Sequence, residues 1–228
     1  GMFAGMHRGH KAVIARTVER ARQLGVRSVA MTFTPHPVLV HYPDRYIRPL
    51  SSVSQRLERL EAQHVDATLL VNYTLEFAAL SPEEFVRTHI VDLLNARVVV
   101  LGSDARFGAG NSGDIETMRE LGEKYGFEVD VIDDLVDPAS GRRWSSTWIR
   151  EALADGDVET AGYVLGKAHL VRGEVVHGAH RGRELGYPTA NLKAEDVGVV
   201  PIDGVYSGWL TDGDVRYPAA ISVGTNPT

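Results

Sequence analysis

The chain contains no cysteine among its 228 residues, so disulfide bonds and a thiol nucleophile are both excluded. It also lacks a long apolar run, since none approaches the ~20 residues that a membrane-spanning helix needs, and its N-terminus does not read as a signal peptide. Positive charge is not in excess: the formal net charge of −6 argues against a nucleic-acid partner. We therefore expect a cytoplasmic protein with no membrane contact that acts on small molecules.

The first two thirds of the chain alternate between two periodicities. Strand-like apolar runs occupy residues 26–33, 66–73, 97–101 and 127–132. Helical patterns occupy residues 7–24, 55–63, 81–95 and 114–125. Gly25 is a suitable helix end, and Ser81 and Glu84 have the spacing of a capping box. Apolar strands that alternate with helices predict a doubly wound, Rossmann-like α/β domain with a parallel sheet.

The pattern changes after Gly166, where short strand-like runs are separated by glycine-rich stretches. These runs lie at residues 169–176, 205–210 and 216–223, without a helical pattern between them. Such spacing is typical of antiparallel strands in a barrel or sandwich. We predict a doubly wound α/β domain over residues 1–167 and a partial antiparallel β-barrel domain over residues 168–228.

The sequence GMFAGMHRGH at the N-terminus has the features of a phosphate site. Gly5 and Gly9 flank a helix start, and His7 and His10 are three residues apart, which places them on one face of its first turn. The N-terminus of a helix attracts anions, and two imidazoles there can donate hydrogen bonds to a phosphate. The spacing alone is equally compatible with two surface histidines that happen to be neighbours. A zinc pair is a third interpretation, but no third ligand lies nearby.

A second phosphate-binding pattern lies at residues 143–150, RWSSTWIR. Ser146 and Thr147 stand at the start of a predicted helix, with Arg143 and Arg150 on either side. The hydroxyls alone indicate no more than a helix cap, whereas guanidinium groups pair with phosphate oxygens in two-point contacts. In a doubly wound fold both segments would lie at the carboxyl ends of strands, where ligands bind.

The sequence GAHRGRELGYPTANL at residues 178–192 is the most distinctive stretch of the chain. Its spaced glycines allow close approach to phosphates, and Thr189 and Asn191 offer neutral oxygen ligands to a hard cation. Taken by itself, the segment is better explained as a glycine-rich hairpin loop in which these residues form turns.

Together these motifs resemble the bacterial bifunctional FAD synthetases over essentially the whole chain. GMFAGMHRGH, TFTPHP at residues 32–37, GSDARFG at 102–108 and SSTWIR at 145–150 resemble, in order and spacing, the FMN adenylyltransferase module. GRELGYPTANL resembles the riboflavin kinase signature, as do PIDGVYSG at 201–208 and AISVGTNPT at 220–228. The resemblance implies adenylyl transfer from ATP to FMN, giving FAD and pyrophosphate, and phosphorylation of riboflavin to FMN by ATP.

The resemblance also assigns roles to individual residues of this sequence. Catalytic stabilisation of the phosphates falls to His7, His10 and Arg150. ATP binding falls to Gly5, Gly9, Arg143, Ser146 and Thr147. Flavin binding falls to Phe33, Pro35, His36, Asp104 and Phe107. The Mg²⁺ that accompanies ATP in the kinase domain would be bound by Thr189 and Asn191.

Three positions depart from the family pattern: Ala4 and Thr34 replace aspartates, and Ala105 replaces an aromatic residue. Both ends of the chain look cut, and the kinase base would lie beyond Thr228, so we expect no riboflavin phosphorylation by the chain as given. Two alternatives stay open. One is a non-catalytic flavin- or nucleotide-binding derivative, which Ala4 favours, and the other is a nucleotidyltransferase for another small phosphorylated substrate.

Overall fold

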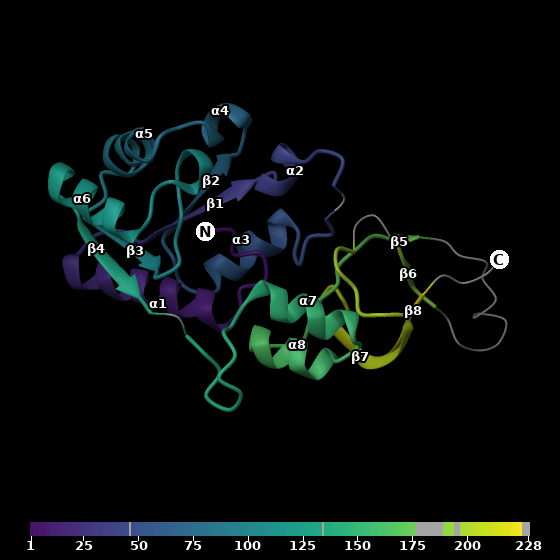
Figure 1. Ribbon diagram of the computed structural model, residues 1–228. Coiled ribbons are helices and arrows are strands. Elements are labelled where there is room, and N and C mark those ends of the chain that lie inside the picture. The colour runs from purple at the N-terminus through teal and green to yellow at the C-terminus, as the bar shows by residue number, and fades with distance from the viewer. Residues whose placement is uncertain (46, 134, 177–188, 194–196, 225–228) are drawn as a thin grey trace. The chain divides into compact units, whose positions relative to one another are not determined.

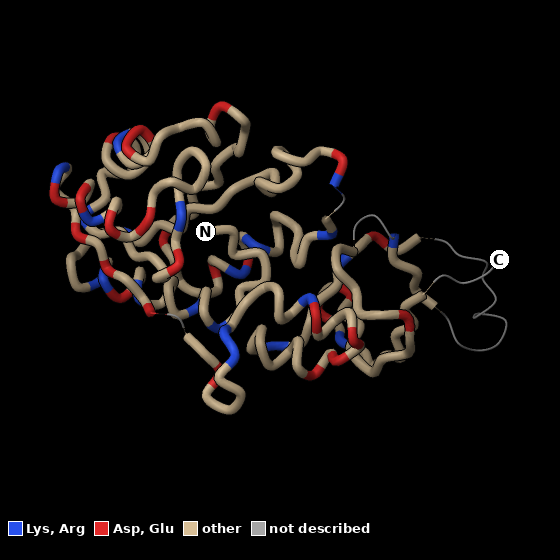
Figure 2. Tube along the Cα trace, viewed as in Figure 1, with Lys and Arg blue, Asp and Glu red and all other residues tan. Residues whose placement is uncertain are grey.

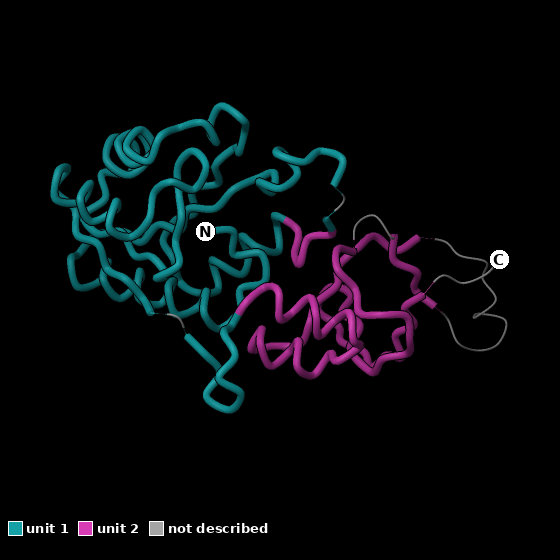
Figure 3. Tube along the Cα trace, in the orientation of Figure 1, with its two compact units in different colours: residues 1–47, 53–144 teal, residues 48–52, 145–228 magenta. Residues whose placement is uncertain are grey.

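The structure is a computed structural model that describes residues 1–45, 47–133, 135–176, 189–193 and 197–224 (Figure 1). The chain forms two compact units (Figure 3). Unit 1 comprises residues 1–47 and 53–144, and unit 2 comprises residues 48–52 and 145–228. Unit 2 contains two helices before its first strand, whereas the predicted domain boundary at 167/168 lies after those helices. That boundary therefore stays a prediction. No helix in the described ranges is long and apolar enough to cross a membrane.

Unit 1 is built from parallel strand pairs and helices, which confirms the predicted α/β class. Its strands are β1 (Val29–Thr34), β2 (Ala67–Asn72), β3 (Val98–Gly102) and β4 (Glu128–Ile132). Strand β1 pairs with β2 and β3 pairs with β4, both in parallel. Over the described residues the strands form these two pairs rather than one hydrogen-bonded sheet. Helix α1 packs against β3, and α6 against β4 (Figure 1).

The helical segments of unit 1 are α1 (Arg8–Leu24), α2 (Pro37–His41), α3 (Val53–Glu61), α4 (Leu75–Ala78), α5 (Pro82–Phe85), η1 (Val86–Leu93), η2 (Ala109–Asn111) and α6 (Ile115–Tyr125). The helices predicted in unit 1 are present, and three short helical segments, α2, α4 and η2, were not predicted. Gly25 ends α1 with a φ of 65°, as its position in the sequence predicts. Ser81 and Glu84 form the predicted capping box of α5.

The helix expected over residues 81–95 is only partly an α-helix. After the short α5 it continues as the π-helix η1, in which the Leu94 amide donates to the His89 carbonyl five residues back. Apolar spacing did not reveal this change, because both helix types bury one side of the segment. Here Val86 and Ile90 are the buried residues. π-Helical turns are rare and often occur at functional sites.

Two hydrophobic clusters hold unit 1 together. One joins the N-terminal loop, α1, β1 and α3 through Phe3, Met6, Ile14, Ala30 and Leu60. The other joins η1, α6 and the start of β4 through Val86, Ile90, Met118, Leu121 and Phe127. The N-terminal loop is therefore part of the core and is not a loose end of the unit.

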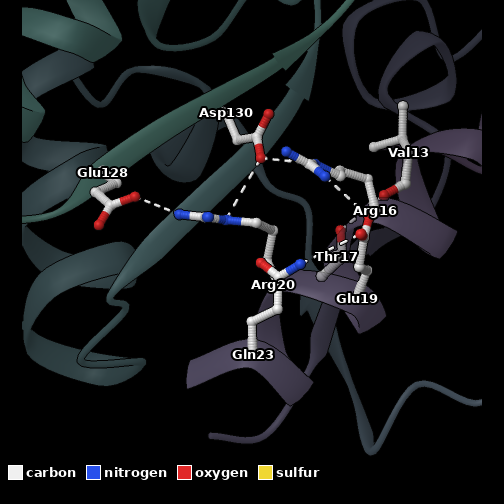
Figure 4. Close-up of polar contacts among 8 residues, drawn as sticks. All are labelled: Val13, Arg16, Thr17, Glu19, Arg20, Gln23, Glu128 and Asp130. Carbon is white, nitrogen blue, oxygen red and sulfur yellow. Dashed lines mark hydrogen bonds and ion pairs between the residues drawn. The ribbon is translucent and has the colours of Figure 1, made fainter. Parts of the chain in front are cut away.

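An ion-pair network fixes α1 along β4 (Figure 4). Arg16 Nε lies 2.8 Å from Asp130 Oδ2, and Arg20 Nε lies 3.5 Å from the same oxygen. Arg20 also pairs with Glu128. Figure 2 shows the basic residues of α1 beside acidic residues of this part of unit 1. The network attaches the middle of α1 to β4, away from the two histidines at the start of the helix.

Unit 2 begins with α7 (Ser146–Ala154) and α8 (Val158–Leu165), whose contact buries Ile149, Leu153 and Val164. Its strands are β5 (Val175–Val176), β6 (Asn191–Leu192), β7 (Gly204–Asp212) and β8 (Val215–Val223). Strand β5 pairs with β6 and β7 with β8, both antiparallel, as predicted. The tight turn between β7 and β8 uses Gly213 at a φ of 57°.

Candidate active site

The two N-terminal histidines form a stacked pair at the start of α1. Their ring centroids are 3.7 Å apart with an interplanar angle of 24°. His7 is also the N-cap, because its Nδ1 accepts a hydrogen bond from the His10 backbone amide at 3.3 Å. An accepting Nδ1 means that neutral His7 carries its proton on Nε2. His7 therefore caps the helix with Nδ1 and keeps a hydrogen-bond donor on Nε2.

The loop before the pair is held in a strained backbone conformation. Phe3 and Met6 have φ values of 49° and 46°, the left-handed region that ordinary side chains rarely adopt. Such residues cost about 1–3 kcal/mol each and persist only where packing enforces them. Both side chains are buried, with 6% and 1% of their surface exposed. The Phe3 ring also meets the His10 ring edge-on at 5.3 Å. Burial in the core thus holds the loop ready-formed in front of α1.

Both histidines are neutral at pH 7. Burial and, to a smaller extent, the nearby charge of Arg143 lower the pKa of His7 from 6.5 to about 4, while Asp104 acts in the opposite direction. Burial, followed by the charge of His7, lowers the pKa of His10 to about 3. The pair therefore acts on a ligand through hydrogen bonds of neutral imidazoles rather than as two fixed cations.

The low pKa values predict that the folded protein loses stability in acid. Below pH 6.5 the histidines of the unfolded chain take up protons, whereas the folded pair does so only near pH 4 and pH 3. We expect the free energy of unfolding to fall by about 2–4 kcal/mol from pH 7 to pH 4 through this pair. Denaturant unfolding of the parent and of a His7→Gln/His10→Gln variant measures the difference.

The double variant should show a flatter decline with pH than the parent. If the free energy of unfolding fell equally with pH in the parent and in the double variant, the assignment of His7 and His10 as buried neutral imidazoles would be wrong.

An ion pair that the sequence did not predict stands beside the histidines. Arg143 Nη2 lies 2.5 Å from Asp104 Oδ2. The loop that carries Arg143 is closed by a β-bridge between Val136 and Arg143. Asp137, 2% exposed, accepts hydrogen bonds from the Ser140 amide and hydroxyl at 2.9 and 2.6 Å. The charges of Arg143 and Asp104 both act on His7. The predicted ATP-binding residue Arg143 and the predicted flavin-binding residue Asp104 therefore lie together beside His7.

Gly9 leaves room for the His7 ring. A Cβ at position 9 would lie 3.2 Å from His7 Nδ1 and 3.3 Å from His7 Cε1, tighter than ordinary contact. We expect Gly9→Ala to displace the ring by a few tenths of an ångström. The adenylyl transfer that the resemblance implies should then slow about tenfold, because catalytic geometry tolerates little misplacement. Alanine in place of glycine also favours the helix by about 1 kcal/mol. Steady-state kinetics beside thermal unfolding separate the two effects.

The matched control is Gly162→Ala in α8, where the added Cβ would meet its nearest atom at an ordinary 3.5 Å. That variant should keep its activity and gain slightly in stability. If Gly9→Ala kept the parent kcat and KM, the added methyl group would fit beside the His7 ring, and the close contact expected there would be wrong.

An aromatic cluster near the carboxyl ends of β1 and β2 links two predicted flavin residues, Phe33 and Phe107, through the rings of Phe77 and Phe85. Phe33 contacts Phe77 at 5.7 Å, Phe77 contacts Phe85 at 6.0 Å, and Phe85 contacts Phe107 at 5.8 Å, all between ring centroids. Tyr73 joins the cluster at 5.9 Å from Phe33. The sequence reasoning named only Phe33 and Phe107. Tyr73 could have been predicted from the sequence. It directly follows β2, and Phe33 lies near the end of the neighbouring strand β1, so the two side chains are expected at the same edge.

The remaining flavin candidates follow β1 directly. Pro35 is joined to Thr34 by a cis peptide bond. His36 is the N-cap of α2, since its Nδ1 accepts from the Val38 amide at 3.2 Å. The histidine of TFTPHP therefore fixes the turn that leaves the strand, which its sequence position did not indicate.

The nucleotide candidates of the SSTWIR motif lie in unit 2. Ser145 is the N-cap of α7, with its hydroxyl accepting from the Trp148 amide at 3.1 Å, and Ser146 and Thr147 form the first turn. Arg150 donates to the Arg48 carbonyl at 3.0 Å, and burial lowers the pKa of its guanidinium. The capping interpretation thus holds for Ser145, which leaves Ser146 and Thr147 as the hydroxyls of the motif to be tested for ATP binding.

The kinase loop is described only at its end. Asn191 opens β6 and pairs with Val176 of β5. Residues 178–188 lie outside the described residues. The predicted cation ligands Thr189 and Asn191 are therefore placed, and the glycine-rich part of the motif is not.

Two family models match the chain: one described as FAD synthetase over residues 1–148, and one described as riboflavin kinase over residues 165–228. The chain is 34% identical to the bifunctional riboflavin kinase/FMN adenylyltransferase of Escherichia coli K12, covering 100% of this chain and 72% of the relative. It is 33% identical to the protein of the same name from Bacillus subtilis 168, covering 100% and 71%.

A solved structure gives the same picture of the fold. A crystal structure described as a macrolide-efflux protein from Streptococcus pneumoniae superposes with a TM-score of 0.89 and 34% sequence identity, covering 100% of this chain and 73% of that one. Sequence and fold relatives thus extend over both units.

Proposed function

The chain belongs to the bifunctional riboflavin kinase/FMN adenylyltransferase family of FAD biosynthesis, and on this basis we propose that its N-terminal part joins FMN to the adenylyl group of ATP. An FMN phosphate oxygen attacks the α-phosphorus of ATP in line. The bond to the bridging oxygen of the β-phosphate breaks, and pyrophosphate leaves. The observation that carries the proposal is the stacked, neutral His7–His10 pair at the start of α1.

The histidine pair suits this reaction because phosphoryl chemistry depends on positioning and on donors aimed at developing charge. Negative charge grows on the α-phosphate oxygens as the bond forms. His7 offers its Nε2–H without giving up the helix cap, and α1 adds the partial positive charge of its N-terminus. Gly5 and Gly9 let the backbone approach the phosphates, and Arg143, Ser146, Thr147 and Arg150 are proposed to bind the rest of the triphosphate.

The aromatic cluster supports an isoalloxazine-binding role for the segments that we assign to flavin. Flat rings prefer aromatic faces and edges, and Phe33 and Phe107 belong to a connected set of such rings. Pro35 and His36 adjoin Phe33. Asp104 would bind the polar end of the flavin, and Arg143 would exchange its Asp104 partner for a substrate phosphate.

We further propose that the C-terminal part belongs to the riboflavin kinase reaction and that Mg²⁺ accompanies ATP there. The hydroxyl of Thr189 and the carboxamide of Asn191 are the neutral oxygen ligands that a hard cation accepts. Asn191 is fixed by its place in β6. When bound, the ion would neutralise phosphate charge, and this chain's residues would hold and orient it. The reactions are proposed to occur in the cytoplasm on free small molecules.

Product analysis by mass spectrometry tests the proposal. The chain is incubated with ATP, Mg²⁺ and FMN, and separately with ATP, Mg²⁺ and other phosphorylated acceptors. FAD with pyrophosphate is the expected outcome. ATP turnover only with another acceptor would indicate a different nucleotidyltransferase. Binding of FMN and ATP without any product would indicate the non-catalytic derivative that Ala4 makes conceivable.

A further inference from the structure

Arg56 is a buried cation to which neither the sequence nor the family assignment gives a role. It lies in α3 and has 6% of its surface exposed. Its Nη1 donates to the Met2 carbonyl at 3.0 Å, and its Nη2 donates to the Phe33 carbonyl at 2.8 Å. One guanidinium therefore joins two chain segments that lie thirty-one residues apart in sequence.

The two bridged segments are the ones to which the proposed function assigns different substrates. Met2 begins the loop that leads through Ala4 and Gly5 to His7, which faces the nucleotide. Phe33 ends the apolar part of β1 and is followed by the flavin segment. Thr32 of the same strand also donates to the Met2 carbonyl, at 3.2 Å. The Gly1 amine donates to the Met31 carbonyl of β1 at 2.8 Å as well. Arg56 is the side chain that extends this connection from Met2 to the Phe33 carbonyl, next to the flavin segment.

The charge of Arg56 is not balanced within unit 1. Burial lowers its pKa, and no neighbouring charge acts against that effect. Over the described part of the chain, Arg56 makes its hydrogen bonds to backbone carbonyls and has no ion pair with a carboxylate. A buried cation without a counter-ion is costly, and ATP and FMN bring several negative charges to the two segments that Arg56 joins.

We propose that Arg56 is a positioning residue for adenylyl transfer, which holds the flavin-binding end of β1 in register with the phosphate-binding loop. This inference rests on the proposed function. The fork of a guanidinium reaches two carbonyls at once from a fixed plane, whereas the ammonium of lysine is a point charge on a shorter reach. Loss of the bridge shifts the two substrates relative to one another without removing any group that touches them.

The test compares Arg56→Met, Arg56→Lys and Arg16→Met in the whole chain. Arg16 is the control, because its guanidinium also makes polar contacts in unit 1, but with Asp130 and Glu19 and away from the start of α1. For Arg56→Met we expect kcat for FAD formation to fall about tenfold at saturating ATP and FMN, with smaller changes in either KM. Arg56→Lys, which keeps the charge, should recover part of kcat.

Folding is followed separately by circular dichroism and thermal unfolding, and kinetics are measured where each variant is folded. Arg16→Met should lose stability and keep kcat. The inference is overturned if folded Arg56→Met keeps the parent kcat, or if Arg16→Met loses as much kcat as Arg56→Met. If Arg56→Met does not fold, an Arg56→Lys variant with parent kcat overturns it equally. A parent chain that makes no FAD would contradict the proposed function instead.

Discussion

His10→Ala is expected to lower kcat for FAD formation by about 10²- to 10³-fold, the usual effect of removing one preorganised group that faces developing charge. The His10 imidazole is stacked on His7 and held edge-on by Phe3, so its direction is fixed before substrate binds. Because it acts on charge that grows in the transition state, the ATP KM should change much less than kcat. Steady-state kinetics at saturating FMN measure both constants.

The corresponding change at His36 is the control for this prediction. His36→Ala removes the N-cap of α2, worth about 1 kcal/mol, next to the proposed flavin segment. It should raise the FMN KM and leave kcat at saturating FMN largely intact. A His10→Ala variant with a raised ATP KM and the parent kcat would show that His10 binds the ground state only.

Ala4→Asp is expected to raise kcat by about 10²- to 10³-fold, because the family pattern has a carboxylate at this position. Ala4 lies in the strained loop between Phe3 and Met6, whose positive φ values fix where a side chain at position 4 would start. A carboxylate there would stand near the phosphates and their Mg²⁺, where this chain offers a methyl group. FAD formation under saturating ATP, Mg²⁺ and FMN measures the gain.

Ala4→Asn is the matched control, since it has nearly the same shape without the charge, and it should give little of the gain. The pKa of the neighbouring histidines supplies an independent readout: a nearby anion stabilises their protonated forms, so NMR titration should show higher values in Ala4→Asp than in Ala4→Asn. A folded Ala4→Asp variant that is no faster than the parent would contradict the role given to this position.

Much of the fold follows from local signals in the sequence. Parallel strands alternating with helices, the Gly25 helix end and the Ser81–Glu84 capping box are all confirmed. These features depend on periodicity and on short-range hydrogen bonds. The π-helix η1 was not predicted. The apolar period that buries Val86 and Ile90 does not distinguish backbone hydrogen bonds five residues apart from those four residues apart.

The candidate site was predictable as a set of motifs but not as a set of contacts. The His7–His10 spacing indicated one helix face, and the structure stacks the rings. The Asp104–Arg143 pair and the Arg56 bridge connect residues far apart in sequence, and no local pattern reports such pairs. The aromatic residues that connect Phe33 to Phe107 were not predicted for the same reason, since Phe77 and Phe85 lie in helices between the TFTPHP and GSDARFG motifs.

The most direct test of adenylyl transfer follows the α-phosphate of ATP. The chain is incubated with FMN, Mg²⁺ and ATP labelled at the α-phosphorus, and in a parallel reaction with ATP labelled at the γ-phosphorus. Adenylyl transfer to FMN predicts that the α-label appears in FAD at one label per FAD, while the γ-label appears in pyrophosphate. An α-label that stays in ATP or is released only as AMP, with no labelled flavin, would contradict it.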